Sequence, residues 1–424
     1  MLYHMLVRQG LSCVFYVCQL NPTPHMLCLV YPASIDGRKI VFINLLHHFD
    51  FSLQPLPNRL NMPSLNLYLA VIGVGGVGTA FLSQLSSLPA LLRPTLVFVS
   101  RSSKQLYTPS YAPVSASNLA SSSSKLLSLA ELTTYLSSAP GKAILVDNTS
   151  NQDVANAYPS FLRAGISVVT PNKKAFSGPL QLWTDIFAAV EASSGKVLVY
   201  HESSVGAGLP VISTLKDLVA TGDTVTRIEG VFSGTMSFLF NSFAPVDAGS
   251  GQGGAKWSTI VSQAKDAGYT EPDPRDDLNG MDVARKLTIL ARLVGLKVQG
   301  PESFPVQSLI PKELESAASS AEFLARLPEF DVQMEGYKDA AAREGKVVRY
   351  VGSVDVAASA VKVGLEMVEK GTPIASLRGS DNLICFYTKR YGANPLVIQG
   401  AGAGGEVTAM GVTGDLIKVV ERLR

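Results

Sequence analysis

The sequence is poor in cysteine and histidine, and this scarcity excludes several protein classes. Four cysteines in 424 residues, with no paired short spacing, do not suit a disulfide scaffold or a zinc ribbon. No apolar run reaches the roughly 18–20 residues that a membrane span requires. Charge is also sparse and balanced, since 36 basic and 34 acidic side chains leave a net charge of +2. We therefore expect no nucleic-acid partner and no membrane insertion.

What the sequence does contain indicates a folded protein of several domains. An apolar fraction of 46% is too high for a disordered chain. At about 100–200 residues per domain, the length allows about two or three domains with ample buried core. We expect a soluble enzyme of a reducing compartment, the cytoplasm, that acts on a small-molecule substrate.

Residues 1–61 differ from the rest of the chain. They hold three of the four cysteines and four of the five histidines, and neither helical nor strand periodicity persists in them. Neither a secretory signal nor an arginine-rich mitochondrial presequence fits them well. We interpret them as a disordered extension or a mis-assigned gene start, with Met62 as the initiator.

A glycine-rich motif lies between an apolar run at 65–72 and a predicted helix at 79–92. The run is typical of a buried strand, so the motif stands where a dinucleotide-binding fold requires it. Its glycines permit a tight turn, close approach of a pyrophosphate and close packing of the helix on the strand. A tight strand–helix turn without a ligand is the alternative. The residues of the motif are Gly73, Gly75, Gly76, Val77 and Gly78.

The end of the next predicted strand, 95–100, bears on the type of dinucleotide. An NAD site usually has an acidic residue there that binds the ribose 2′-hydroxyl. No Asp or Glu occurs between Asp50 and Glu131, whereas Arg101 and Lys104 stand among serines. These side chains suit a 2′-phosphate, so we predict NADPH in preference to NADH. A solvated polar loop is the alternative.

Polar residues also follow the predicted strands 143–146 and 166–170. Because the carboxyl ends of parallel strands meet at the ligand crevice, we expect Thr149 and Ser150 to lie near a cofactor. Lys173, after the second strand, is placed to reach a phosphate, a carboxylate or a reacting carbonyl. A solvated lysine pair with its neighbour is the alternative.

The segment 201–210 joins a predicted strand to a helix that starts near Pro210. Two glycines and a proline indicate a constrained loop with several carbonyls turned aside. Those carbonyls and the Glu202 carboxylate suit an oxygen cage for a hard cation. From composition alone, a domain hinge is the alternative. We interpret His201, the only histidine outside 1–61, as a packing residue rather than a base.

Residues 268–286 form the most specific stretch of the chain. Four carboxylates occur from Glu271 to Asp277, and Asp282 and Lys286 follow at i and i+4 on a helix predicted to run through Leu296. Such a pair is usually a solvated salt bridge, and clustered carboxylates also suit a divalent metal. Here the carboxylates would suit a substrate that carries an amino group.

These blocks together resemble homoserine dehydrogenase in its short, fungal-type form without a C-terminal regulatory domain. The resemblance extends over about 65–424 and is most specific in 268–286, where every diagnostic position matches. It implies reversible reduction of L-aspartate 4-semialdehyde to L-homoserine with NADPH or NADH, in threonine, methionine and isoleucine biosynthesis. A noncatalytic NADP-binding protein of the same fold and a metal-dependent hydrolase or lyase are the alternatives.

The resemblance also implies roles for individual residues. Lys286 would donate the proton to the carbonyl oxygen, beside the substrate-binding Asp282. The other implied substrate contacts are Glu271, Asp277, Thr235, Tyr269 and Lys173. Lys173 is also a cofactor contact, as is Gly404 in a second glycine-rich turn at 400–405. A monovalent cation, Na⁺, would be bound by Glu202, Val205, Ala207 and Leu209.

The implied fold class is α/β. A Rossmann-type dinucleotide-binding domain, 62–200 with 403–424, would be joined to an α+β catalytic and dimerisation region with a mixed sheet. Within that region, 211–345 would form the catalytic part, and 201–210 with 346–402 the part that pairs two subunits. We therefore expect a homodimer.

Overall fold

The computed structural model describes residues 14–16, 28–30, 66–247 and 255–424. The chain divides into two compact units, 1–63 and 64–424. In the first unit, β1 (Val14–Tyr16) pairs antiparallel with β2 (Cys28–Val30). The remainder of 1–61 and the proposed start at Met62 lie outside the described residues.

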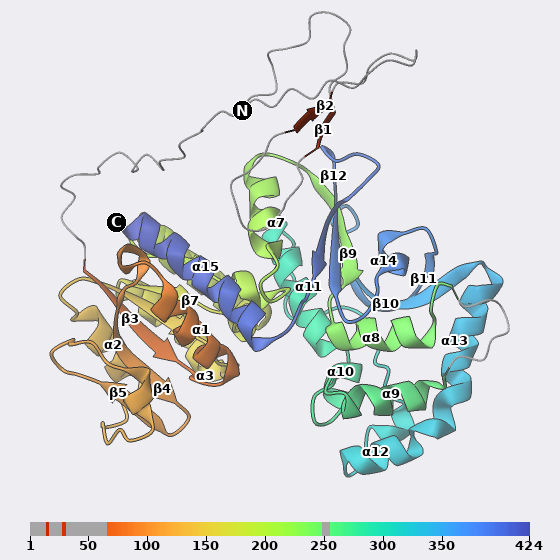
Figure 1. The fold of residues 1–424 in the computed structure, drawn as a ribbon, viewed down its shortest axis with the longest axis horizontal. Helices are drawn as coiled ribbons and strands as arrows, with labels where there is room; N and C mark the ends of the chain where they lie inside the picture. The colour runs from red at the N-terminus through yellow and green to blue at the C-terminus, as the bar shows by residue number, and fades with distance from the viewer. Residues whose placement is uncertain (1–13, 17–27, 31–65, 248–254) are drawn as a thin grey trace, which may run out of the picture. The chain divides into compact units, whose positions relative to one another are not determined.

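A six-stranded sheet in the second unit has the order β5-β4-β3-β6-β7-β8 (Figure 1). Its pairs are parallel except β4 with β5, which is antiparallel, so this sheet is mixed. β3 is buried along its whole length, as its uninterrupted apolar run predicts. The strands are β3 (Leu67–Ile72), β4 (Thr95–Arg101), β5 (Lys104–Tyr107), β6 (Lys142–Asp147), β7 (Ile166–Val169) and β8 (Val199–Tyr200).

Helices from both ends of the unit pack on this sheet. α15 lies beside α1 although they are far apart in sequence (Figure 1), and Val412 and Phe81 belong to one apolar cluster. α1 begins within the glycine motif, three residues earlier than predicted. The helices are α1 (Gly76–Ser87), α2 (Leu129–Ser137), α3 (Gln152–Asn156), α4 (Tyr158–Arg163), α5 (Lys174–Ser177), α6 (Leu180–Ala192) and α15 (Gly405–Leu423), with 3₁₀ turns at Ala90–Leu92, Ala116–Leu119 and Glu202–Ser204.

A second sheet has the order β11-β10-β9-β12-β13. Every pair in it is antiparallel, so the mixed pairing expected for this region belongs instead to the first sheet. The α/β class with a Rossmann-type core and a second α+β region is confirmed. The strands are β9 (Val225–Val231), β10 (Lys346–Asp355), β11 (Ala360–Glu369), β12 (Asn382–Thr388) and β13 (Leu396–Gly400).

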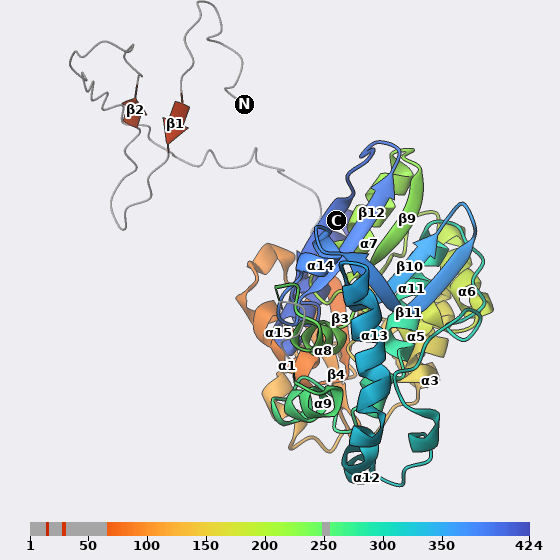
Figure 2. The same cartoon turned by 90° about the vertical axis from the view of Figure 1, so that its right-hand side faces the viewer.

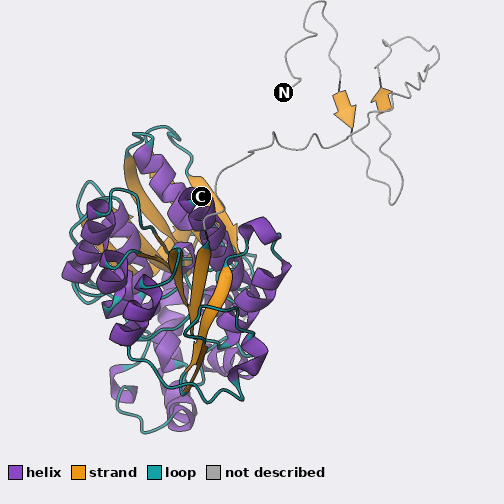
Figure 3. Cartoon of the chain, turned by 90° about the vertical axis from the view of Figure 1, so that its left-hand side faces the viewer, coloured by secondary structure: helices purple, strands orange, loops and turns teal. Residues whose placement is uncertain are grey.

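Three helices, α8, α11 and α13, pack against β10 of this second sheet (Figure 2). Figure 3 shows how helices and strands are distributed through the unit. No helix in the described part of the chain is long and apolar enough to span a bilayer. The helices are α7 (Val211–Ala220), α8 (Gly234–Phe243), α9 (Trp257–Asp266), α10 (Arg275–Leu278), α11 (Met281–Leu293), α12 (Ser320–Arg326), α13 (Asp331–Arg343) and α14 (Pro373–Ser376), with 3₁₀ turns at Lys312–Leu314 and Leu327–Phe330.

Glycines set both ends of α11, the helix that carries the candidate catalytic pair. Gly280 precedes it with φ 74°, and a Cβ there would lie 2.1 Å from the Tyr350 hydroxyl oxygen. The helix ends at Leu293, three residues before the predicted Leu296. Gly295 explains the difference, because its left-handed conformation (φ 92°) turns the backbone out of the helix.

Candidate functional site

The glycine motif forms the turn between β3 and α1. The Gly73 and Val74 amides both donate to the Ser100 carbonyl oxygen at 3.0 Å, so the turn lies at the end of β4. A Cβ at Gly78 would lie 2.1 Å from the Gly73 carbonyl oxygen, which explains why only glycine fits there. A Cβ at Gly75 would have no atom within 4 Å. The turn therefore leaves open space at the start of α1, where an anion would meet free backbone amides.

A cleft of about 1150 Å³ brings together most of the residues selected from the sequence. Segments from both sheets line it, including the strand ends after β6 and β7, the start of α8 and the loop 401–404. The selected residues that line it are Val77, Thr149, Ser150, Lys173, Ala207, Thr235, Tyr269, Glu271, Asp277, Asp282, Lys286 and Gly404. Those outside its lining are Gly73, Gly75, Gly76, Gly78, Arg101, Lys104, Glu202, Val205 and Leu209.

The Asp282 carboxylate bridges two ammonium groups. Its Oδ2 lies 2.8 Å from Lys286 Nζ, and its Oδ1 lies 3.2 Å from Lys173 Nζ. The Lys286 side chain is only 8% exposed, whereas that of Asp282 is 43% exposed, so the carboxylate faces the cleft. Lys286 Nζ also donates to the Phe232 carbonyl oxygen at 2.6 Å. Since an ammonium group has three N–H donors, one remains for a substrate atom.

The electrostatics of this cluster follow from burial and from the two lysines. Burial lowers the pKa of Lys286, the Asp282 carboxylate raises it again, and the Lys173 charge adds to the lowering. Burial alone would raise the pKa of Asp282. The charges of Lys286 and Lys173 overcome this effect and hold the pKa of Asp282 well below its usual value.

Asp277 and Glu271 place two further carboxylates in the cleft. Asp277 Oδ1 lies 2.9 Å from the Thr235 hydroxyl, and its Oδ2 accepts the Glu271 amide at 2.8 Å. Burial raises the pKa of Asp277, with a smaller contribution from the Asp282 charge. The Glu271 side chain is exposed. The Tyr269 ring stacks on Phe238 at 4.3 Å, and its carbonyl oxygen accepts the Thr235 hydroxyl at 2.6 Å.

Of the two remaining acidic residues of 271–277, Asp276 also lines the cleft, whereas Asp273 lies outside its lining. Asp273 pairs with Arg275 at 2.6 Å, and Arg275 also donates to the Ala317 carbonyl oxygen at 2.7 Å. Within the described ranges, no three His, Cys, Asp or Glu side chains are grouped to hold a metal ion.

A buried network organises the cofactor side of the cleft. Asp147 is buried at the end of β6 and accepts the Thr149 amide at 2.8 Å, the Asn172 side-chain amide at 3.1 Å and the Tyr158 hydroxyl. Burial raises the pKa of Asp147, and these hydrogen bonds oppose the rise. The network joins the strand ends that carry Thr149 and Lys173, and so holds both residues in the cleft.

Asn148 provides a test of whether the cleft fits a dinucleotide. Both polar atoms of its side-chain amide are buried and lack a hydrogen-bond partner among the residues described. Buried amides are normally paired, so these atoms suit a polar ligand group in the cleft that Asn148 lines. Together with the open glycine turn, they fit a bound nicotinamide dinucleotide.

The two cations selected for a 2′-phosphate are exposed. Arg101 ends β4 directly after Ser100, whose carbonyl oxygen bonds the glycine turn. Lys104 begins β5 and donates to the Ala120 carbonyl oxygen. Neither residue lines the cleft.

In the loop 201–210, the Glu202 side chain caps a helix, which the sequence did not predict. Its carboxylate accepts the Ile212 amide at 2.7 Å and the Ser213 amide at 3.0 Å, so it caps the first turn of α7. The backbone turns through Gly206 and Ala207 with φ of 78° and 54°. No donor in the described segments bonds the Val205 or Ala207 carbonyl oxygen.

His201 is buried, as its interpretation as a packing residue requires. Its ring stacks on Phe176 with centroids 4.0 Å apart, and its Nδ1 lies 3.0 Å from the Ser204 hydroxyl. Burial lowers the pKa of His201 well below its usual value, so the ring is neutral near pH 7.

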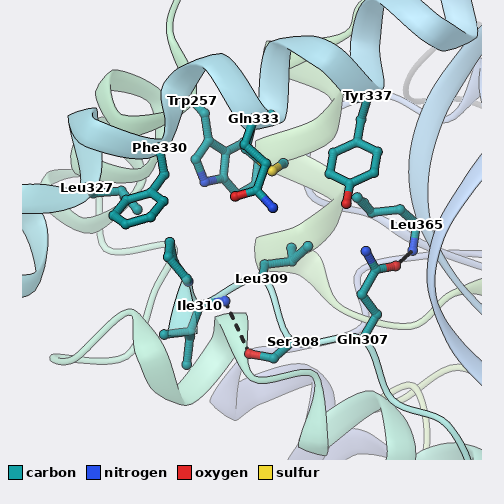
Figure 4. Close-up of a pocket in the computed structure, with 12 residues that line it drawn as sticks. Trp257, Gln307, Ser308, Leu309, Ile310, Leu327, Phe330, Gln333, Tyr337 and Leu365 are labelled. Carbon is teal, nitrogen blue, oxygen red and sulfur yellow. Dashed lines mark hydrogen bonds between the residues drawn. The ribbon is translucent and has the colours of Figure 1, made fainter. Parts of the chain in front are cut away.

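A second cavity, shown in Figure 4, is lined mainly by residues of α9, α13 and the segment 307–311. It holds only about 50 Å³ and has no charged side chain in its lining, so it offers no chemistry comparable with that of the large cleft. Its lining includes Trp257, Gln307, Ser308, Leu309, Ile310, Leu327, Phe330, Gln333, Tyr337 and Leu365.

Sequence reasoning missed two groups beside Lys286. One is the Phe232 carbonyl oxygen, 54 positions away along the chain, and the other is Asn382, which donates to that same oxygen at 3.1 Å. A backbone carbonyl has no signature in the sequence, and no motif surrounds Asn382.

Comparisons with known proteins show what the chain is similar to. The family model described as homoserine dehydrogenase matches residues 210–417, and the one described as homoserine dehydrogenase, NAD binding domain, matches 73–200. The chain is 64% identical to homoserine dehydrogenase of Emericella nidulans over 84% of this chain and 99% of that one. It is 49% identical to homoserine dehydrogenase of Saccharomyces cerevisiae over 84% and 98% of the two chains.

Solved structures have the same fold. A Candida auris protein of unknown function has a TM-score of 0.81 and 50% identity over 85% of this chain and 99% of that one. A hyperthermophilic archaeal homoserine dehydrogenase mutant in complex with NADPH has a TM-score of 0.63, covering 84% and 98%. At 21% identity, the latter likeness concerns the fold alone.

Proposed function

The chain belongs to the homoserine dehydrogenase family, and from that premise we propose how its residues carry out the reaction. The protein is an NAD(P)-dependent oxidoreductase acting on a CH–OH group, and it interconverts L-aspartate 4-semialdehyde and L-homoserine. The observation that carries the proposal is the buried Lys286 ammonium in the cleft, paired with Asp282 at 2.8 Å.

Lys286 is proposed to move the proton of the reaction. The nicotinamide, when bound, supplies or accepts the hydride. As negative charge develops on the substrate oxygen during reduction, the free N–H of Lys286 stabilises that charge and donates its proton. In the oxidative direction, neutral Lys286 takes the hydroxyl proton. Its lowered pKa brings the neutral form within reach at a lower pH than an ordinary lysine would allow.

Asp282 and Lys173 set the position and the protonation of this lysine. Through its two oxygens, Asp282 fixes the distance between the ammonium groups, and its negative charge favours protonated Lys286. Lys173 opposes that effect with its positive charge and stands after β7, near the proposed cofactor contacts. We propose that Asp282 also binds the substrate.

The substrate amino group is proposed to bind the carboxylates of Glu271 and Asp277. Asp277 is oriented by Thr235 and by the Glu271 amide, and each of its oxygens retains a lone pair for an N–H donor. Thr235 and Tyr269 complete this side of the cleft. Thr235 is in the first turn of α8, whose backbone amides have no acceptor inside the helix.

A nicotinamide cofactor is supported by the match of 73–200 to the NAD-binding domain of the family. We propose that Gly73–Gly78 holds the pyrophosphate and that Thr149, Ser150 and Gly404 contact the cofactor in the cleft. Arg101 and Lys104 are proposed to bind a 2′-phosphate, since both follow the end of β4 beside the glycine turn. NADPH is accordingly proposed over NADH.

A monovalent cation, Na⁺, is proposed to bind in the loop 201–210. The support is chemical: the carbonyl oxygens of Val205 and Ala207 lack donors within the described ranges and suit a hard cation. The Glu202 carboxylate caps α7, and the carbonyl oxygens of Glu202 and Leu209 accept the Val205 and Val211 amides. We propose that each of these two oxygens binds the cation with its second lone pair. Because Ala207 also lines the cleft, the cation would hold this part of the loop in place beside the cleft.

The assembly is proposed to be a homodimer formed through the second sheet. Its edge strands β11 and β13 expose the apolar side chains of Met367 and Val397. The division into a dinucleotide-binding part, a catalytic part and a dimerisation part at the predicted boundaries is likewise proposed. Cytoplasmic location stays a prediction.

One assay tests the proposed function against its alternative. Purified protein should reduce NADP⁺ when homoserine is added at alkaline pH, and a chelator of divalent metals should leave the rate unchanged. Binding of NADPH without turnover would favour a noncatalytic NADP-binding protein of the same fold.

A further inference from the structure

A buried asparagine lies beside the lysine of the site without belonging to any motif. Asn382, the first residue of β12, is 0% exposed. Its Nδ2 donates to the Phe232 carbonyl oxygen at 3.1 Å, and the same oxygen accepts Lys286 Nζ at 2.6 Å. The asparagine amide and the ammonium group are therefore neighbours through one shared acceptor.

The other side of this asparagine contacts the glycine-rich loop. β12 pairs with β13 so that Asn382 lies opposite Gly400, where the loop begins. A Cβ at Gly402 would lie 1.9 Å from Asn382 Nδ2 and 2.6 Å from its Oδ1, so no side chain fits between the loop and the amide. Gly402 also lines the cleft. Asn382 thus fills the space between a wall of the cleft and the carbonyl that holds Lys286.

The Asn382 side chain is not explained by packing alone. Its Oδ1 is buried and has no hydrogen-bond partner among the residues described. Leaving a buried polar atom unpaired costs about 1–3 kcal/mol. An apolar side chain of similar shape would avoid that cost but would give up the donor to Phe232. What the amide provides at this position, and an apolar side chain would not, is therefore the hydrogen bond to the Phe232 carbonyl oxygen.

We propose that Asn382 is a positioning residue for Lys286. Its amide fixes the direction of the Phe232 carbonyl, and it transmits displacements of the loop 400–405 to the ammonium group. The charged groups that face Lys286 are Asp282 on α11, Lys173 before α5 and Asp277 on α10. Asn382 restrains the position of Lys286 through an uncharged hydrogen bond. It comes from β12, an element that carries none of these charges. The inference rests on the proposed role of Lys286 in proton transfer.

A double-mutant cycle tests this inference, with Asn382→Ala, Gly402→Ala and the two combined. Asn382→Ala should lower kcat roughly five- to tenfold, the loss expected for one hydrogen bond, and leave the Kd for NADPH unchanged. Gly402→Ala should lower kcat similarly, because its methyl group displaces the amide. In the double variant the methyl group enters the vacated space, so kcat should equal that of Asn382→Ala alone.

Gly371→Ala is the matched control, since a Cβ there meets nothing within 4 Å, and it should leave kcat unchanged. Should Asn382→Ala fold poorly in a thermal scan, Asn382→Ser takes its place in the cycle. Three results would each overturn the inference. The first is that the losses of kcat in the two single variants multiply in the double variant. The others are an unchanged kcat in Asn382→Ala and a loss confined to NADPH affinity.

Lys286→Met, assayed in parallel, separates this inference from the proposed function. If Lys286→Met keeps its turnover, the proposed role of Lys286 in proton transfer fails, and the inference fails with it. If Lys286→Met is inactive while the Asn382 and Gly402 effects multiply, only the positioning role of Asn382 is refuted.

Discussion

Lys286 Nζ lies closer to the Phe232 carbonyl oxygen, at 2.6 Å, than to the Asp282 carboxylate, at 2.8 Å. The ammonium group is therefore held by a neutral backbone group as well as by an ion pair. Two of its N–H donors are directed by the protein, which leaves the third for the proposed bond to the reacting oxygen. This arrangement differs from that of a surface salt bridge, and it supports the proposed role of Lys286 as an acid.

The two charged neighbours of Lys286 should shift the pH dependence of homoserine oxidation in opposite directions. In the proposed mechanism, oxidation requires neutral Lys286, so kcat/KM should rise with pH through the pKa of that group. Asp282→Asn removes a charge that raises this pKa, so the rise of kcat/KM should move to lower pH. Lys173→Met removes a charge that lowers the pKa of Lys286, so the rise of kcat/KM should move to higher pH. A rise of kcat/KM that moves in the same direction in both variants would contradict the account.

Two glycines of the nucleotide turn should respond differently to the same substitution. Gly75→Ala meets no protein atom within 4 Å, so it should preserve the unfolding temperature yet weaken NADPH binding by roughly tenfold, because the methyl group enters pyrophosphate space. Gly78→Ala places a methyl group 2.1 Å from the Gly73 carbonyl oxygen. It should lower the free energy of unfolding by about 1–3 kcal/mol.

Urea unfolding and fluorescence titration with NADPH measure the two effects. The glycine assignment would fail if Gly75→Ala bound NADPH like the wild type, or if Gly78→Ala were as stable as the wild type.

Glu202 should stabilise α7 through its side chain and bind the proposed cation through its backbone. Glu202→Ala removes the acceptor of the Ile212 and Ser213 amides, so it should lower the free energy of unfolding by about 0.5–2 kcal/mol. Glu202→Gln keeps one acceptor oxygen and should lose less. In thermal scans, NaCl should raise the unfolding temperature of Glu202→Gln as much as that of the wild type, relative to choline chloride. Loss of the sodium effect in Glu202→Gln would show that the carboxylate is itself a ligand.

Local patterns predicted much of the fold. The apolar run before Gly73 is β3, and the helix carrying Asp282 and Lys286 is α11. Boundaries were less certain, because they depend on single backbone conformations such as that of Gly295. Strand direction in the second sheet depends on long-range pairing, which local periodicity does not contain.

The site was predictable only in part, for a related reason. Spacing places Asp282 and Lys286 on one helix face, but it says nothing of the Phe232 carbonyl, which comes from a different element. The use of the Glu202 carboxylate as a cap for α7 depends on how the loop folds back onto that helix. Contacts made by backbone groups across elements have no residue-type signature, and so they appear only in the structure.

The central claim is that Lys286 moves the proton, and the Lys286→Met variant tests it most directly. NADPH titration and thermal unfolding first establish that the variant binds cofactor and is folded. The account predicts wild-type affinity for NADPH together with a fall in kcat for homoserine oxidation by a factor of about 10²–10⁴. A folded variant that binds NADPH and turns over at a rate close to the wild type would contradict it.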